Sequence, residues 1–263
     1  MEPKFYKKQN VANFCIKPIL LITVCVLLVY SSCRKDTTQT PSSPNNAAVS
    51  GQIAVNLSKS LAGNFGGLNL NDGVDSISFQ QHSGPQHACT CMNSNPLCGF
   101  YTDSLVNYTN KIIDTTWHTG GNLKFYFNCV NGKLSGYSAY DSLTTVKTTP
   151  QSVSTYNVQQ WYTIQALDDQ HQFIGVSGTN DYKSSVVYTG KSGAPEVGGA
   201  FYELTDLKIN VVTKDILSGT ATFKAYGPTW NVTGTITFLG NHMADMTMNG
   251  QTYHVNLLTG KLS

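Results

Sequence analysis

Histidine and cysteine side chains gather in one short stretch of this 263-residue chain. His82, His87, Cys89, Cys91 and Cys98 lie within 17 residues. Zinc accepts ligand atoms from both residue types, so a metal site is one interpretation of this cluster. The His-x-Cys and Cys-x-Cys spacings, however, lack the two-residue gaps that are common in structural zinc sites. We therefore favour disulfides and free loop histidines, and predict no metal or other cofactor; zinc stays the alternative.

Cysteine pairing is the second chemical question. Four cysteines follow Cys33, an even number that favours disulfides if the protein is exported. Cys129 shares the alternation of Phe125 and Phe127, which points it towards a core, and Cys98 lies in a turn-rich approach to Phe100-Tyr101. We predict a Cys98–Cys129 disulfide. The pairing of Cys89 and Cys91 stays open, as do the other connectivities.

No catalytic motif is recognisable in the sequence. Asp168-Asp169 with His171 has the residue types of an acid–base cluster, but a polar turn between two strands explains it. Asp245 and His254 have the types of a carboxylate–histidine pair, and we interpret them as a surface cross-strand pair. We predict that the protein is not an enzyme, and retain a hydrolase only as the last alternative.

The N-terminus predicts export. A lysine-bearing start leads into an apolar run, Ile19 to Tyr30, that spans roughly 18 Å as a helix, well short of the ~30 Å hydrocarbon core of a bilayer. The run closes on Tyr30-Ser31-Ser32-Cys33, which resembles the lipobox of bacterial lipoproteins. The resemblance implies a signal peptide over residues 1–32 and a lipid on Cys33. Residues 33–50, rich in Thr, Ser, Pro and Asn, read as a flexible lipidated tether.

Removing the signal changes the charge. The chain has 17 Lys and Arg and 15 Asp and Glu; residues 1–32 hold four Lys and one Glu, which leaves 13 and 14, a net charge of −1. We therefore expect no nucleic-acid partner. The expected partners are the membrane, through the lipid on Cys33, and a small apolar or carbohydrate ligand. The sequence leaves the oligomeric state open.

The remaining residues, 51–263, are predicted to form one β-rich domain. Thr, Tyr, Val, Gly and Asn are frequent and Glu is scarce, a composition typical of short strands joined by turns. One helix is expected near the start, where an apolar residue recurs every fourth position, with Ser50 as its cap and Gly63 at its end. The recurring residues are Val49, Ile53, Leu57 and Leu61.

Strand register can be predicted at the C-terminus. Asn249-Gly250 favours a two-residue hairpin that pairs Met246 with Tyr253 and Asp245 with His254. For the preceding turn we predict a three-residue loop over 239–241, with Gly240 or Asn241 left-handed, pairing Ile236 with Ala244 and Val232 with Met248. Segments 123–136 and 207–219 also resemble each other, which suggests an internal duplication, although two generic hairpins explain them equally well.

We therefore predict an all-β fold, a curved antiparallel meander forming a barrel or half-barrel with one short N-terminal helix; a two-sheet β-sandwich is the alternative. Patches such as Cys98-Gly99, Phe127-Asn128-Cys129, 238–243 and 253–260 resemble uncharacterised lipoproteins of Bacteroidota-type bacteria. The expected function is that of an outer-membrane lipoprotein of the cell envelope, with a non-enzymatic binding or structural role. The alternative is a carrier or chaperone for lipid or another apolar ligand.

Overall fold

A computed structural model of the chain describes residues 45–74 and 97–263. The sequence-based predictions for the signal, the lipidation site Cys33 and the His82–Cys91 cluster fall on residues outside these ranges. Among the described residues, no helix combines the length and the hydropathy that a membrane span requires.

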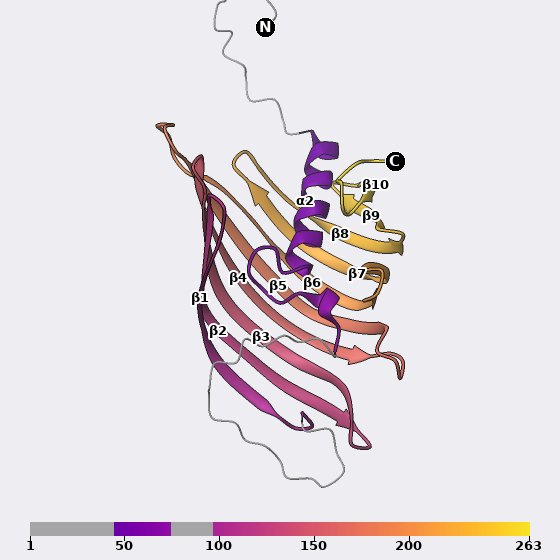
Figure 1. Ribbon diagram of the computed structural model, residues 1–263. Coiled ribbons are helices and arrows are strands. Elements are labelled where there is room, and N and C mark those ends of the chain that lie inside the picture. Colours follow the sequence, from indigo (N-terminus) through magenta and orange to yellow (C-terminus); the bar gives the residue numbers. More distant parts are fainter. Residues whose placement is uncertain (1–44, 75–96) are drawn as a thin grey trace, which may run out of the picture. The chain divides into compact units, whose positions relative to one another are not determined.

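The described residues form one antiparallel sheet of ten strands in strictly sequential order (Figure 1). The sheet curls but does not close, so the predicted meander is confirmed in its half-barrel form and the two-sheet sandwich is not observed. The strands are β1 (Tyr101–Ile112), β2 (Thr115–Val130), β3 (Lys133–Thr148), β4 (Ser152–Ala166), β5 (Phe173–Tyr188), β6 (Glu196–Asn210), β7 (Asp215–Gly227), β8 (Trp230–Gly240), β9 (Met243–Met248) and β10 (Gln251–Asn256).

One α-helix of the described residues, α2 (Asn46–Leu61), lies on the concave side of the sheet (Figure 1). Its four predicted apolar residues, Val49, Ile53, Leu57 and Leu61, are all buried there, because a spacing of four places them along one helix face. The helix begins at Asn46, inside the segment predicted as tether. A short 3-10 turn, η1 (Leu70–Asp72), follows it.

The predicted cap of this helix was wrong. Asn45 is the N-cap, and its side chain accepts a hydrogen bond from the backbone N–H of Ala47 at 3.0 Å. Ser50 instead lies buried within the helix and donates to the carbonyl of Ala47. At the other end the chain leaves the helix through Gly63, whose φ of 71° is the left-handed conformation that favours glycine.

The hairpin between β9 and β10 confirms the register predicted from the sequence. Met246 pairs with Tyr253 and Asp245 pairs with His254. Both turn residues, Asn249 and Gly250, have the positive φ that a type I′ turn demands. The two segments suggested as a duplication each form a strand, a polar turn and a second strand, in β2–β3 and β6–β7; their common origin stays a prediction.

The register predicted between β8 and β9 was wrong. Ile236 pairs with Met246 rather than Ala244, and the loop is a two-residue turn, Asn241-His242, preceded by a bulge after Phe238. The cause is the buried carboxylate of Asp215 on β7, which accepts the backbone N–H groups of Asn241 at 2.6 Å and His242 at 2.8 Å. Gly240 and Asn241 are both left-handed, where the sequence predicted one of the two.

A disulfide joins Cys98 to Cys129, the pair predicted from the sequence, with their Cα atoms 5.4 Å apart. Cys129 lies on β2 and Cys98 in the turn that leads into β1, so the bond ties the start of the edge strand to its neighbour. The side chain of Cys129 is partly buried against the core.

Removing this disulfide should destabilise the fold. We expect Cys98→Ser or Cys129→Ser to lower the free energy of unfolding by about 3 kcal/mol, because the closed loop restricts the unfolded chain. Urea unfolding of the oxidised protein measures the loss. The double variant should lose no more than either single variant, and additive losses would show that the two sulfurs do not act as one bond.

Candidate functional site

Residues 62–74, which follow α2, cover the middle of the concave side and are fastened by polar contacts. The backbone N–H of Leu68 donates to Gln160 Oε1 at 2.7 Å and to Asp141 Oδ2 at 3.1 Å. The buried hydroxyl of Tyr137 donates to the carbonyl of Gly73 at 3.3 Å. These contacts join a loop with almost no regular structure to the centre of β3 and β4.

A second polar group holds the helix itself. Asn180 on β5 exchanges hydrogen bonds with Ser60 of α2, at 2.9–3.0 Å, and donates to the hydroxyl of Tyr162 at 2.7 Å. The hydroxyl of Tyr202 donates to the carbonyl of Ile53 at 3.2 Å. All of these side chains are buried. Buried polar groups of this kind fix where the helix lies, because each loses a partner if the helix shifts.

Asp141 is the most perturbed carboxyl among the described residues. Its side chain is only 1% exposed, and burial raises its pKa to about 7, although the N–H of Leu68 acts in the lowering direction. Its second oxygen, Oδ1, and Gln160 Nε2 have no hydrogen-bond partner among the described residues. Asp141 therefore crosses between charged and neutral forms near neutral pH.

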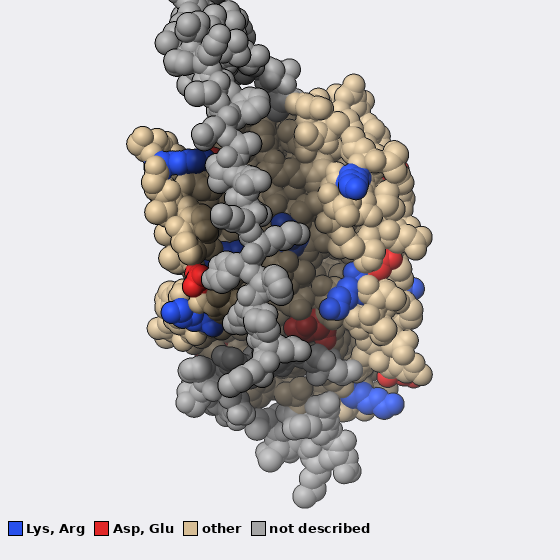
Figure 2. All heavy atoms as spheres, turned by 45° about the horizontal axis from the view of Figure 1, so that its top comes forward, with Lys and Arg blue, Asp and Glu red and all other residues tan. Residues whose placement is uncertain are grey.

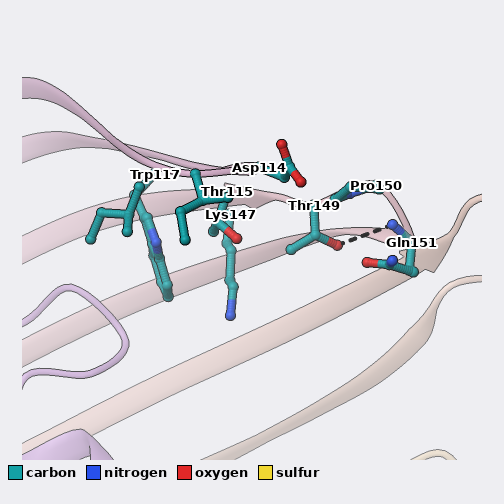
Figure 3. Close-up of a pocket in the computed structure, with 9 residues that line it drawn as sticks. Asp114, Thr115, Trp117, Lys147, Thr149, Pro150 and Gln151 are labelled. Atoms are coloured by element: carbon teal, nitrogen blue, oxygen red, sulfur yellow. Dashed lines mark hydrogen bonds between the residues drawn. The ribbon is translucent and has the colours of Figure 1, made fainter. Parts of the chain in front are cut away.

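An open hollow of about 480 Å³ lies at the end of the sheet where the β1–β2 and β3–β4 turns meet (Figure 3). Ile112 and Ile113 supply apolar surface, and Trp117 and Lys147 hang side by side from β2 and β3. Figure 2 shows the concave side of the curled sheet, where the side chains in view are mostly uncharged. The rest of the hollow is lined by Asp114, Thr115, Thr149, Pro150 and Gln151.

The described side chains of the hollow combine a cation, an aromatic ring and apolar surface. Lys147 Nζ lies 4.6 Å from the ring centroid of Trp117, a cation–π geometry that holds the ammonium beside the aromatic face. Among the described residues that line it, Asp114 is the one carboxyl and none is a histidine or a cysteine. A cation, a ring and two hydroxyls favour an amphipathic or polyhydroxylated ligand.

The convex side carries a row of exposed aromatic rings across β1 to β4. Tyr101 and Tyr126 pair directly across β1 and β2, and Tyr140 and Trp161 pair directly across β3 and β4. Their exposed fractions are 43%, 50%, 37% and 64%, whereas the residues on either side of Tyr126, Tyr140 and Trp161 along the chain are buried. The alternation of the strands therefore turns these rings outward. We call these four residues the aromatic row.

Polar side chains border the aromatic row. Lys124 lies opposite Tyr140 and forms an ion pair with Asp103 at 2.8 Å. Ser138 lies opposite Tyr126, and Thr163 lies opposite Ser138. Rings with hydroxyls and charges between them make a surface that is apolar in patches and polar at each edge.

The acid–base candidates from the sequence occupy structural positions. Asp168 Oδ1 accepts the backbone N–H of Phe173 at 2.8 Å, and the N–H of His171 donates to the Asp168 carbonyl, which makes a turn. His254 Nδ1 lies 2.7 Å from Asp245 Oδ1 on a surface where both are over 40% exposed. In residues 45–74 and 97–263, no group of three or more His, Cys, Asp or Glu side chains has metal-binding proximity.

Neither the hollow nor the aromatic row was identified from the sequence. The four residues are cross-strand pairs, but only the register of four strands shows that they share one outer face. A partial signal exists in Trp161, since Gln160 and Tyr162 flank it in an alternating strand. For the hollow, which lies between two turns, the sequence offers no signal.

No family model, curated protein or solved structure matches this chain.

The raised pKa of Asp141 predicts that stability depends on pH. Between about pH 4 and pH 7 the unfolded state has lost this proton while the folded state holds it, so the free energy of unfolding falls as pH rises, by at most about 1.4 kcal/mol per pH unit. We expect Asp141→Asn to remove this dependence. The variant should match the parent near pH 4 and exceed it above pH 7, in urea unfolding at each pH.

Asp103→Asn is the matched control. Its carboxyl is exposed, and the hydrogen bond from Lys124 lowers its pKa, which is the opposite direction. That substitution should leave in place the loss of stability between about pH 4 and pH 7. An Asp141→Asn variant that remains as pH-sensitive as the parent would contradict the role given to Asp141.

Proposed function

We propose that this protein is a lipid-anchored lipoprotein of the cell envelope that binds carbohydrate without transforming it. The observation that carries the proposal is the aromatic row, four rings from four neighbouring strands turned outward on one face. Exposed large aromatic side chains that occur in a group mark interaction surfaces.

The dimensions of the row favour an extended oligosaccharide. Neighbouring strands are ~4.8 Å apart, so four of them carry rings over roughly 14 Å. The C–H face of a sugar stacks on an aromatic face, and its hydroxyls require donors and acceptors at the rim. Ser138, Thr163 and the Lys124–Asp103 pair supply those groups beside the rings. Because Tyr and Trp have few rotatable bonds, they lose little conformational entropy on binding.

The anchored location rests on the sequence. Tyr30-Ser31-Ser32-Cys33 resembles a lipobox, and a lipid at Cys33 would fix the protein in the outer membrane. Each buried methylene of such a lipid contributes about 0.8 kcal/mol, so several acyl chains hold a protein permanently. The Cys98–Cys129 disulfide supports the same compartment, since such bonds persist in an oxidising envelope.

The hollow supports a second candidate function, transport of an amphipathic anion such as a fatty acid. Ile112 and Ile113 are 59% and 84% exposed there, next to the ammonium of Lys147. Apolar surface beside one cation suits an acyl chain with a carboxylate. The core beneath α2 is filled by side chains such as Phe125, Tyr162 and Tyr202, which favours surface binding over an enclosed carrier cavity.

Carbohydrate binding can be measured on the full chain in mild detergent. We expect soluble oligosaccharides, screened by isothermal titration calorimetry, to bind, and Trp161→Ala to weaken the affinity about tenfold, because it removes about 1.4 kcal/mol of stacking. Trp117→Ala, which alters the hollow on the other face, is the control and should leave the affinity unchanged.

The same pair of variants separates the two candidates. Binding of a fluorescent fatty acid that is lost in Trp117→Ala, with no binding of any oligosaccharide, would replace the carbohydrate proposal with the carrier. Saccharide binding that survives Trp161→Ala would remove the aromatic row as its site.

Anchoring has its own test. We expect mass spectrometry of the membrane fraction to find a mature chain that begins at a lipidated Cys33, and Cys33→Ala to abolish the lipid mass. An unmodified Cys33 in a soluble product would contradict the localisation.

A further inference from the structure

The two edges of the sheet are unlike each other. At β10, the last residues of the chain fold back over the edge: Asn256 and Lys261 share a backbone hydrogen bond, Ser263 donates to His254, and Leu262 bridges to Val255. At β1, no described residue pairs with the outer side of the strand. One edge is covered by the chain itself, whereas the other, twelve residues long, has no partner strand among the described residues.

Within its own twelve residues, β1 has neither the proline nor the bulge that often protects an edge strand. Natural proteins shorten edge strands or interrupt them with proline or bulges, because a row of unpaired N–H and C=O groups recruits another strand. β1 contains no proline, and its pairing with β2 is continuous from Tyr101 to Ile112. Leu105, at its centre, is 78% exposed.

The direction of the free backbone groups follows from the pairing with β2. The N–H of Phe127 donates to the carbonyl of Phe100 at 3.0 Å, so even-numbered residues of β1 direct their backbone groups towards β2. The odd-numbered residues, from Tyr101 to Lys111, therefore direct theirs outward. An added antiparallel strand must meet those positions.

We propose that β1 pairs with β1 of a second copy of this chain, antiparallel and centred on Asn107, to make a symmetric dimer with one continuous sheet. In this register Asp103 lies opposite Lys111 of the partner and Lys111 lies opposite the partner's Asp103. The neighbouring registers lack this charge pair. In a pairing centred on residue 106, Asp103 lies opposite Thr109 of the partner, and in one centred on residue 108 it lies opposite Ile113. Charge complementarity thus selects one register.

The other positions fit the same register. On the convex side Tyr101 meets Ile113 and Leu105 meets Thr109, so the exposed apolar side chains gain neighbours. On the concave side the pairs are Thr102 with Ile112, Ser104 with Asn110 and Val106 with Tyr108. Lys111 has no carboxylate partner in the part of the chain that the structure describes, whereas Asp103 already contacts Lys124. The arrangement is isologous, so it closes at two copies and does not propagate.

Engineered cysteines test the register directly. In the full chain in mild detergent, Asn107→Cys places two sulfhydryls across the two-fold axis, where paired Cα atoms are ~5.5 Å apart, within disulfide range. We expect a mild oxidant to crosslink this variant at least tenfold more than Thr109→Cys. Thr109 lies on the same strand and the same face as Asn107, but the two copies of Thr109 are roughly 14 Å apart in this dimer.

Sedimentation velocity supplies the second measurement. We expect the parent protein to sediment as a dimer at micromolar concentration. In Lys111→Glu the new carboxylate of each copy faces Asp103 of the other copy, so the dissociation constant should rise at least tenfold. A parent that stays monomeric at 100 times that concentration would overturn the proposal. So would a dimer in which Asn107→Cys and Thr109→Cys crosslink equally, because its interface would lie elsewhere. Neither readout requires saccharide binding.

Discussion

An open sheet with one apolar face must cover that face, and this requirement governs the structure. Ten strands curl into a half-barrel whose concave side presents large buried side chains, including Phe125, Phe127 and Tyr137. Nothing in the meander can supply the cover, because every strand is part of the surface to be covered. Residues 45–74 perform this task, with an apolar helix face towards the sheet and few regular hydrogen bonds after it.

The cover is fixed by polar contacts that are costly to leave unpaired. Hydrophobic contact is not directional, so by itself it would not fix the position of the helix along the sheet. Asn180, Tyr202 and Tyr137 each form a hydrogen bond with a particular atom of the covering segment. Asp141 and Gln160 differ from these three, since Asp141 Oδ1 and Gln160 Nε2 in the same layer have no hydrogen-bond partner among the described residues. The same layer thus gives the fold its specificity and its sensitivity to pH.

Much of this fold follows from local patterns, and the failures have identifiable causes. The four-residue spacing in α2 and the Asn249-Gly250 turn each depend on neighbours in sequence, and each was predicted correctly. The β8–β9 register depends on Asp215, which lies 26 residues away from Asn241, and no local pattern reveals that contact. The candidate site is harder still: the hydrogen bond from Leu68 to Asp141 joins residues 73 apart, and the aromatic row exists only once four strands are aligned.

The contact between the two ends of the domain bears on how the protein folds. A Cβ on Gly51 of α2 would collide with the backbone of Gly260, so helix and C-terminal turn touch directly, and Tyr202 reaches a helix residue 149 positions earlier. Contacts of such high sequence separation slow folding, because their loops must close before any gain is realised. The helix, although made first, has no complete surface to dock on until the last strands exist. We therefore expect the apolar face of α2 to complete its docking only when the C-terminal strands have formed.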